Sequence, residues 1–217
     1  MRLLFFILLA ASTYYLPGQS GIVFQNSSRV NPNRYDDIQG SPMMFKDWMP
    51  GRIIGKGGEI FPDLFLNFNG YTQGFEAKQG DQYIELDNSQ CVLVEVFVGE
   101  DTMRFAAEML SPVRGNWVEQ IFVGNGVYCI KHFNVDVSTQ VVQNVGNEVK
   151  FKRFNPKSHY FFLEGGDLEE FRPRRKSVLK LLGGSKETAQ YLDVNEIDVE
   201  SDSGLRRVLQ YYAGLKN

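Results

Sequence analysis

The stretch Gln90–Val98 shows the clearest alternation of side chains in the chain. Four valines, at positions 92, 94, 96 and 98, lie on one face. The opposite face carries Cys91, Leu93, Glu95 and Phe97. β-Branched residues suit a pleated surface, and two apolar faces are typical of a strand covered on both sides. We therefore predict a central strand, flanked by strands at about 82–87 and 102–110, with the four valines in the main core.

Apolar stretches of similar length recur through the middle of the chain. They predict strands at about 60–69, 73–78, 82–87, 91–98, 102–110, 116–124, 126–137 and 158–164. The breaks between them are rich in Gly, Asn and Asp, and short strands at such even spacing describe an antiparallel meander. The predicted fold class is therefore mainly β, with a sandwich or barrel-like body. Residues 138–157 are polar and predict a long loop between strands.

One predicted hairpin can be given a register. Asn125-Gly126 is typical of a two-residue type I′ turn, which would place Gly124 opposite Val127. Counting back from the turn then places Glu119 opposite His132. A β-bulge would shift this register by one residue and change every pair beyond it.

Beyond Gly165-Gly166 the pattern changes from strands to short helices. A basic run, Arg172–Lys176, leads into a helix over about 177–182, which Gly183 is placed to end. A second helix is predicted over about 185–193 and a third over about 203–214, whose apolar residues form one stripe for docking. Residues 196–200 predict a short edge strand or an extended loop.

The N-terminus has the layout of a secretory signal peptide. Arg2 precedes an uninterrupted apolar run, and small residues follow at a cleavage position after Ser20. The run is short for a membrane span, and no second apolar segment is long enough to cross as a helix. The alternative is a hydrophobic N-terminal strand that stays on. The predicted organisation is a signal peptide over 1–20, an extended lead-in over 21–40, a β-rich body over 41–172 and a helical tail over 173–217, packed on the body.

Charge and cysteine usage narrow the function classes. The chain has 23 basic and 26 acidic side chains, a net charge of −3, which argues against generic nucleic-acid binding. The two cysteines, Cys91 and Cys129, leave two alternatives open: one disulfide, or two buried free thiols. Only Arg2 among the charges lies in the predicted signal peptide, so the secreted chain stays acidic.

Three residues are candidates for chemistry. Glu119 opposite His132 could serve general acid/base catalysis, with the carboxylate orienting the imidazole. The simpler interpretation is a cross-strand ion pair that contributes less than about 1 kcal/mol. Glu95 is the only charge inside its apolar strand, so if buried it needs a partner or a raised pKa. Arg104 on the next strand is the partner expected for it.

Other motifs lack the required spacing. Gly51–Gly57 resembles a phosphate loop but misses the spacing and the Ser or Thr of that motif. Residues 198–204 imitate a calcium loop but lack its glycine and its bidentate Glu at the required positions. The two histidines have no zinc-ligand spacing, and no Gly-x-Ser-x-Gly elbow is present. The sequence therefore predicts no catalytic, cofactor-binding or metal-binding residue.

Three motifs carry a resemblance to other proteins. They are Gly40-Ser41-Pro42 with Trp48-Met49-Pro50-Gly51, the segment Leu66-Asn67-Phe68-Asn69, and the ending Leu205…Gln210-Tyr211-Tyr212-Ala213-Gly214-Leu215. Together they resemble uncharacterised secreted proteins of Bacteroidetes with a β-rich body and a short helical tail. The resemblance implies a location in the periplasm or at the cell surface and brings no catalytic residues with it.

The favoured hypothesis is a secreted, non-enzymatic interaction or structural protein of the bacterial cell envelope, with an envelope protein or a polysaccharide as partner. One alternative is a β-barrel or sandwich that binds a small apolar ligand, which would need an enclosed cavity. The other is a hydrolase-type enzyme using Glu119 and His132. An enzyme should bring at least two of Glu95, Glu119 and His132 into one open cleft.

Overall fold

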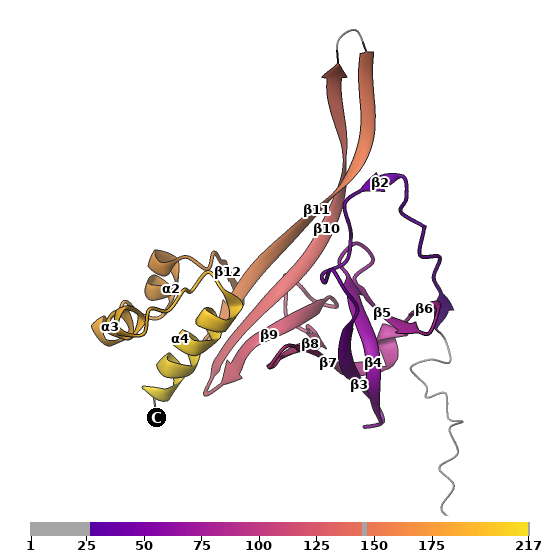
Figure 1. The fold of residues 1–217 in the computed structure, drawn as a ribbon. Coiled ribbons are helices and arrows are strands. Elements are labelled where there is room, and N and C mark those ends of the chain that lie inside the picture. The colour runs from indigo at the N-terminus through magenta and orange to yellow at the C-terminus, as the bar shows by residue number, and fades with distance from the viewer. Residues whose placement is uncertain (1–26, 145–146, 217) are drawn as a thin grey trace, which may run out of the picture.

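The computed structural model describes residues 27–144 and 147–216. Within these ranges the chain forms one 12-stranded mixed sheet, which is not closed, followed by three helices (Figure 1). The prediction of a mainly β fold with short C-terminal helices is confirmed. The predicted signal peptide over 1–20 lies outside the described residues.

The strands are numbered in chain order. They are β1 (Ser28–Arg29), β2 (Ile38–Gln39), β3 (Met49–Gly55), β4 (Ile60–Asn69), β5 (Gly74–Gln79), β6 (Gln82–Glu85), β7 (Cys91–Val98), β8 (Asp101–Ala107), β9 (Trp117–Gly124), β10 (Val127–Asn144), β11 (Asn147–Leu163) and β12 (Glu169–Phe171). The helices are α2 (Arg175–Leu181), α3 (Lys186–Val194) and α4 (Asp202–Gly214), and a 3-10 turn, η1 (Asn88–Gln90), precedes β7. Across the sheet the order is β1-β6-β5-β4-β3-β7-β8-β9-β10-β11-β12, and β2 adds to β11 in parallel.

Strand β7 lies inside the sheet as predicted, but one predicted neighbour is wrong. β8 pairs with it on one side, whereas β3 rather than β6 pairs with it on the other. The reason is that β4, β5 and β6 form their own meander, so the chain returns through η1 to the free side of β3. Val94 and Val96 are fully buried, but Val92 is 51% exposed. A bulge against β3 makes Val92 the extra residue and turns Cys91 inward instead.

The predicted loop over 138–157 is wrong, because these residues continue β10 and β11. The two strands form one antiparallel ladder without a register shift, from Tyr128 opposite Leu163 to Asn144 opposite Asn147. Its outer part, residues 138–144 and 147–153, extends beyond the rest of the sheet and is called the arm (Figure 1). Strand β2 pairs with the base of the arm at Lys152 and Arg153. Most residues of the arm are polar because they are exposed to water, so their composition resembles that of a loop.

The sheet curls until the turn between β4 and β5 meets β10. The N–H of Val135 donates to the carbonyl of Gly70 at 3.0 Å, and the Gln73 amide donates to the carbonyl of Phe133 at 3.0 Å. A Cβ atom at Gly70 would lie 2.5 Å from the Phe133 ring, so this close approach requires glycine. These contacts hold the curled shape without a continuous ladder between the two elements.

Of the three hydrophobic clusters in the described residues, two are large. The body cluster lies inside the curl and includes Phe75, whose ring contacts those of Phe68, Phe105 and Trp117. The helical cluster lies where α2, α3 and α4 cover the end of β9 to β12, and includes Cys129, Phe162, Leu205 and Leu209. Strand β9 contributes to both clusters, through Trp117 in the body cluster and Ile121 in the helical cluster, whereas no residue of the three helices belongs to the body cluster.

Capping residues define the helix boundaries, and Gly183 is the one that the sequence predicts. Ser185 and Ser201 cap α3 and α4 by accepting hydrogen bonds from the N–H groups of Thr188 and Gly204. Gly183 follows the end of α2 with a φ of +76°, the left-handed conformation typical of such stops. Residues 196–200 form no edge strand and lie instead in a loop with turns at its two ends.

Truncating the helical cluster should destabilise the protein. Leu205 is 1% exposed, so Leu205→Ala should lower the free energy of unfolding by about 2–5 kcal/mol. The control Val194→Ala lies on α3 at 73% exposure and should change it by less than about 0.5 kcal/mol. Urea unfolding followed by circular dichroism measures both; equal effects would contradict the proposed packing.

Candidate functional site

The predicted hairpin between β9 and β10 is confirmed near its turn and wrong beyond it. Asn125 and Gly126 have φ values of 49° and 76°, and Gly124 lies opposite Val127. A bulge between Cys129 and Ile130 then shifts the register by one residue. Glu119 consequently lies opposite Lys131 and not opposite His132. The Glu119–His132 pair on which an acid/base mechanism would depend is therefore not formed across the strands.

Glu119 belongs to a charged cluster between the sheet and α4. It is 1% exposed, and neither of its carboxylate oxygens accepts a hydrogen bond. The Lys131 Nζ atom lies 3.4 Å from Glu119 Oε2 and 2.5 Å from Asp202 Oδ2. Tyr160 donates its hydroxyl hydrogen to Asp202 Oδ1 at 2.8 Å. Burial raises the pKa of Glu119 and outweighs the nearby Lys131, so this carboxyl holds its proton more tightly than in water.

His132 lies in a different environment. Its Nε2 atom is 2.9 Å from Gln73 Oε1, and its backbone position is opposite His159 on β11. Burial, with a smaller contribution from His159, lowers the pKa of His132. Glu119 lies opposite Lys131, the residue before His132 on β10. The side chains of Glu119 and His132 therefore point to opposite faces of the sheet.

Glu95 is held by two arginines. Arg52 on β3 and Arg104 on β8 lie directly opposite it in the two flanking ladders. Both donate from Nε, to the two different oxygens of the carboxylate; the Arg104 bond is 2.9 Å long. Burial opposes ionisation, but the two arginines together outweigh it and lower the pKa of Glu95. The expected pair with Arg104 is confirmed, and Arg52 is the partner that the sequence did not indicate.

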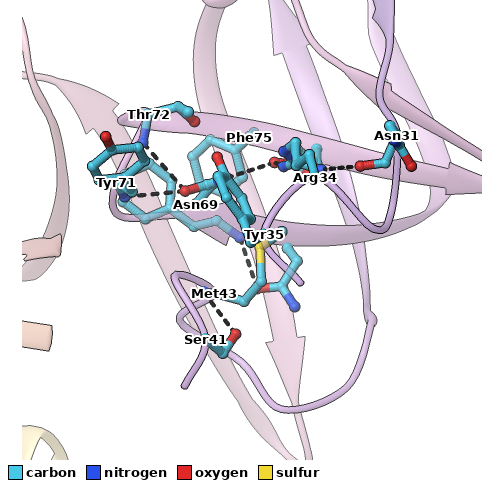
Figure 2. A network of polar contacts seen from close by, with 12 residues as sticks. Asn31, Arg34, Tyr35, Ser41, Met43, Asn69, Tyr71, Thr72 and Phe75 are labelled. Atoms are coloured by element: carbon cyan, nitrogen blue, oxygen red, sulfur yellow. Dashed lines mark hydrogen bonds and ion pairs between the residues drawn. The ribbon is translucent and has the colours of Figure 1, made fainter. Parts of the chain in front are cut away.

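A further buried carboxylate, Glu76 on β5, was not a sequence candidate. Arg34 of the lead-in donates to Glu76 Oε1. Figure 2 shows the polar network to which Arg34 and Asn69 belong. Asn69 on β4 donates to the same oxygen at 2.9 Å and accepts from the N–H groups of Tyr71 and Thr72. Burial raises the pKa of Glu76 despite these partners. The signal in the sequence was a polar residue inside an apolar strand.

A hollow of about 230 Å³ lies beside this network. Its wall includes Arg34, Lys46, Trp48, Glu76 and Tyr83. A second, open hollow of about 1020 Å³ lies between β12 and α2. Its lining includes most of the basic run Arg172–Lys176. Its basic and acidic side chains are balanced: Arg172, Arg174, Lys176 and Lys180 against Glu164, Asp167, Glu169 and Glu170.

The sequence candidates do not meet in a cleft. Glu95, Glu119 and His132 line neither hollow. Among residues 27–144 and 147–216, no group of three or more His, Cys, Asp or Glu side chains is arranged to hold a metal ion. In the same part of the chain, no helix has the length and apolar character needed to cross a membrane.

The two cysteines are free thiols in separate clusters. Cys91 belongs to the body cluster and Cys129 to the helical cluster, and no disulfide joins them. Burial, assisted by Asp87, raises the pKa of Cys91 to about 12, and burial raises the pKa of Cys129 as well. Both thiols therefore stay protonated and behave as small apolar side chains.

Comparison of the chain with known protein families, with curated proteins and with solved structures finds no match.

The two buried carboxylates should respond to pH in opposite directions. The pKa of Glu95 is lowered from 4.5, so its contribution to stability is present above pH 4.5 and is lost as the pH falls through the folded-state pKa. The pKa of Glu119 is raised from 4.5, so its contribution is present below pH 4.5 and is lost as the pH rises through the folded-state pKa.

Urea unfolding of Glu95→Gln and Glu119→Gln between pH 2 and pH 8 tests this contrast. Relative to wild type, Glu95→Gln should be most destabilised at neutral pH, and the difference should shrink in acid. Glu119→Gln should gain stability relative to wild type as the pH rises. Parallel pH profiles for the two variants would contradict the assignment.

The ion pair from Arg34 to Glu76 should stabilise the docking of the lead-in on the body. Arg34→Ala leaves Glu76 buried without a cation and should cost about 3 kcal/mol, of which adding Glu76→Gln should restore a part. Lys152→Ala is a matched control, because it breaks an exposed ion pair to Asp37 of the same lead-in and should cost less than about 1 kcal/mol. If Arg34→Ala and Lys152→Ala lower the free energy of unfolding equally, as measured by urea unfolding, this role of Arg34 is contradicted.

Proposed function

We propose that this protein is a secreted, non-enzymatic interaction protein of the bacterial cell envelope, and that it binds a protein partner through the β10–β11 arm. The observation that carries the proposal is the arm itself, a two-stranded ribbon that extends beyond the body and the helices (Figure 1). At its base, Phe154 packs on Tyr35 and Tyr71, while the outer residues contribute to none of the hydrophobic clusters. A ribbon of this kind is free to contact a partner.

The chemistry of the arm supports a binding role. Three valines on its outer part are exposed: Val141 by 51%, Val142 by 43% and Val149 by 49%. Val142 lies opposite Val149, so these two share one face of the ribbon. Exposed apolar side chains on a projecting element contribute nothing to the core, and burial against a partner would make them favourable.

The alternative functions have less support. Catalysis by Glu119 and His132 lacks a shared cleft, since the two side chains point to opposite faces of the sheet. Binding of a small apolar ligand would need an enclosed apolar cavity, whereas four contacting aromatic rings fill the body. The location in the envelope is supported by the signal-peptide pattern at the N-terminus.

Shortening the arm tests the proposal. Replacing residues 141–150 by Asn-Gly would join Gln140 to Phe151 through a two-residue turn and keep Lys152 and Arg153, which pair with β2. The tagged wild-type protein should recover an envelope protein in a pull-down, and the shortened protein should recover at least about tenfold less of it, with unchanged stability. Equal recovery by both proteins would overturn the arm as the binding element.

A further inference from the structure

The two long edges of the arm differ in sequence. On β10, residues 137–143 read Val-Ser-Thr-Gln-Val-Val-Gln and contain no charge, glycine or proline. On β11, the corresponding stretch carries Lys150, Lys152 and Arg153, with Pro156 and Lys157 just beyond. Natural proteins protect exposed strand edges with such charges and prolines, because an unprotected edge pairs with other strands. The β11 edge is protected in this way and the β10 edge is not.

The backbone of β10 presents its hydrogen-bonding groups along this unprotected edge. The N–H of Val135 points away from β11, since it donates to the carbonyl of Gly70. The ladder has no register shift from there to Asn144, so the same direction recurs at every second residue: Val137, Thr139, Val141 and Gln143. In the described part of the chain, no group hydrogen-bonds to the outward N–H or C=O groups of these four residues.

The β11 edge is also partly occupied. Strand β2 pairs with it in parallel at Lys152 and Arg153, and β12 pairs with it nearer the body. Along β10, by contrast, β9 pairs only as far as Lys131. The longest free edge of the sheet is therefore the outer part of β10.

We propose that this edge pairs antiparallel with the same edge of a second copy of the chain, around a twofold axis at Gln140. This inference rests on the proposed function, because it names the arm's protein partner. The register places Gln140 opposite its own counterpart, Thr139 opposite Val141, and Val137 opposite Gln143. The outward groups of all four outward-facing residues are then paired in both chains, and the arms form a four-stranded sheet with the order β11-β10-β10-β11.

A second copy fits this edge better than an unrelated strand for two reasons. The stretch is uncharged, so pairing it with itself brings no like charges opposite each other. The twofold arrangement also places the protected β11 edges on the outside of the new sheet. Further strands are then excluded, so the pairing ends at a dimer instead of a fibre.

Sedimentation of the purified protein over a range of concentrations tests the dimer. Thr139→Pro removes an outward N–H without breaking the β10–β11 ladder, and should weaken dimerisation at least about tenfold. Lys150→Pro is the matched control, because Lys150 lies opposite Val141 and its N–H likewise points outward, but on the β11 edge. It should leave the dimer intact.

Cysteine cross-linking tests the register. Gln140→Cys should form an intermolecular disulfide under mild oxidation, because the two Cα atoms at a non-hydrogen-bonded pair lie within bonding reach. Val142→Cys lies on the same face but opposite Ser138 of the other copy, and should cross-link poorly. The native cysteines are buried and do not interfere.

The outcomes separate this inference from the proposed function. A dimer that Thr139→Pro disrupts, with selective cross-linking at position 140, supports the pairing. A monomer at every concentration, a dimer insensitive to Thr139→Pro, or equal cross-linking at both positions overturns it. If the dimer is absent but arm shortening still abolishes recovery of another envelope protein, the arm remains a binding element and only the self-pairing fails.

Discussion

The continuous β10–β11 ladder is the feature on which the rest of the structure depends. At its inner end it carries β9 and β12 and contributes Cys129 and Phe162 to the helical cluster. In its middle it accepts the β4–β5 turn and β2 of the lead-in. At its outer end it becomes the arm. Because no register shift interrupts this ladder, the position of each attached element is defined relative to all the others.

The buried carboxylates serve this assembly more directly than they serve chemistry. Glu95 receives arginines from both neighbouring strands, Glu76 receives one from the lead-in, and Glu119 lies between the sheet and α4. Glu108 accepts the hydroxyl hydrogen of Tyr128 at 2.6 Å. A buried charge without a partner is costly, so each of these pairs disfavours arrangements in which its two elements are displaced. This role accounts for the perturbed pKa values of Glu95 and Glu119, which line neither hollow.

The sequence predicted most individual elements but not their long-range partners. Short strands, the end of α2 at Gly183 and the Asn125-Gly126 turn depend on local residues, and these predictions held. The arm was predicted as a loop because exposed strands and loops are both polar. Only the unbroken strand pairing distinguishes the two. The bulge at Cys129 and Ile130 has no local signal, and it displaced Glu119 from His132. For the same reason Arg34 could not be assigned to Glu76, which lies 42 residues away in the sequence.

The long-range contacts of the lead-in affect the order in which the chain folds. Its ion pair from Asp37 to Lys152 joins residues 115 positions apart, and β1 pairs with β6 on the opposite edge of the sheet. Such contacts close long loops and are slow to form. The lead-in can dock only after both halves of the sheet exist, although it precedes them in the chain. A segment that is synthesised early therefore completes the native state late, and until then the Glu76 side of the sheet stays open to water.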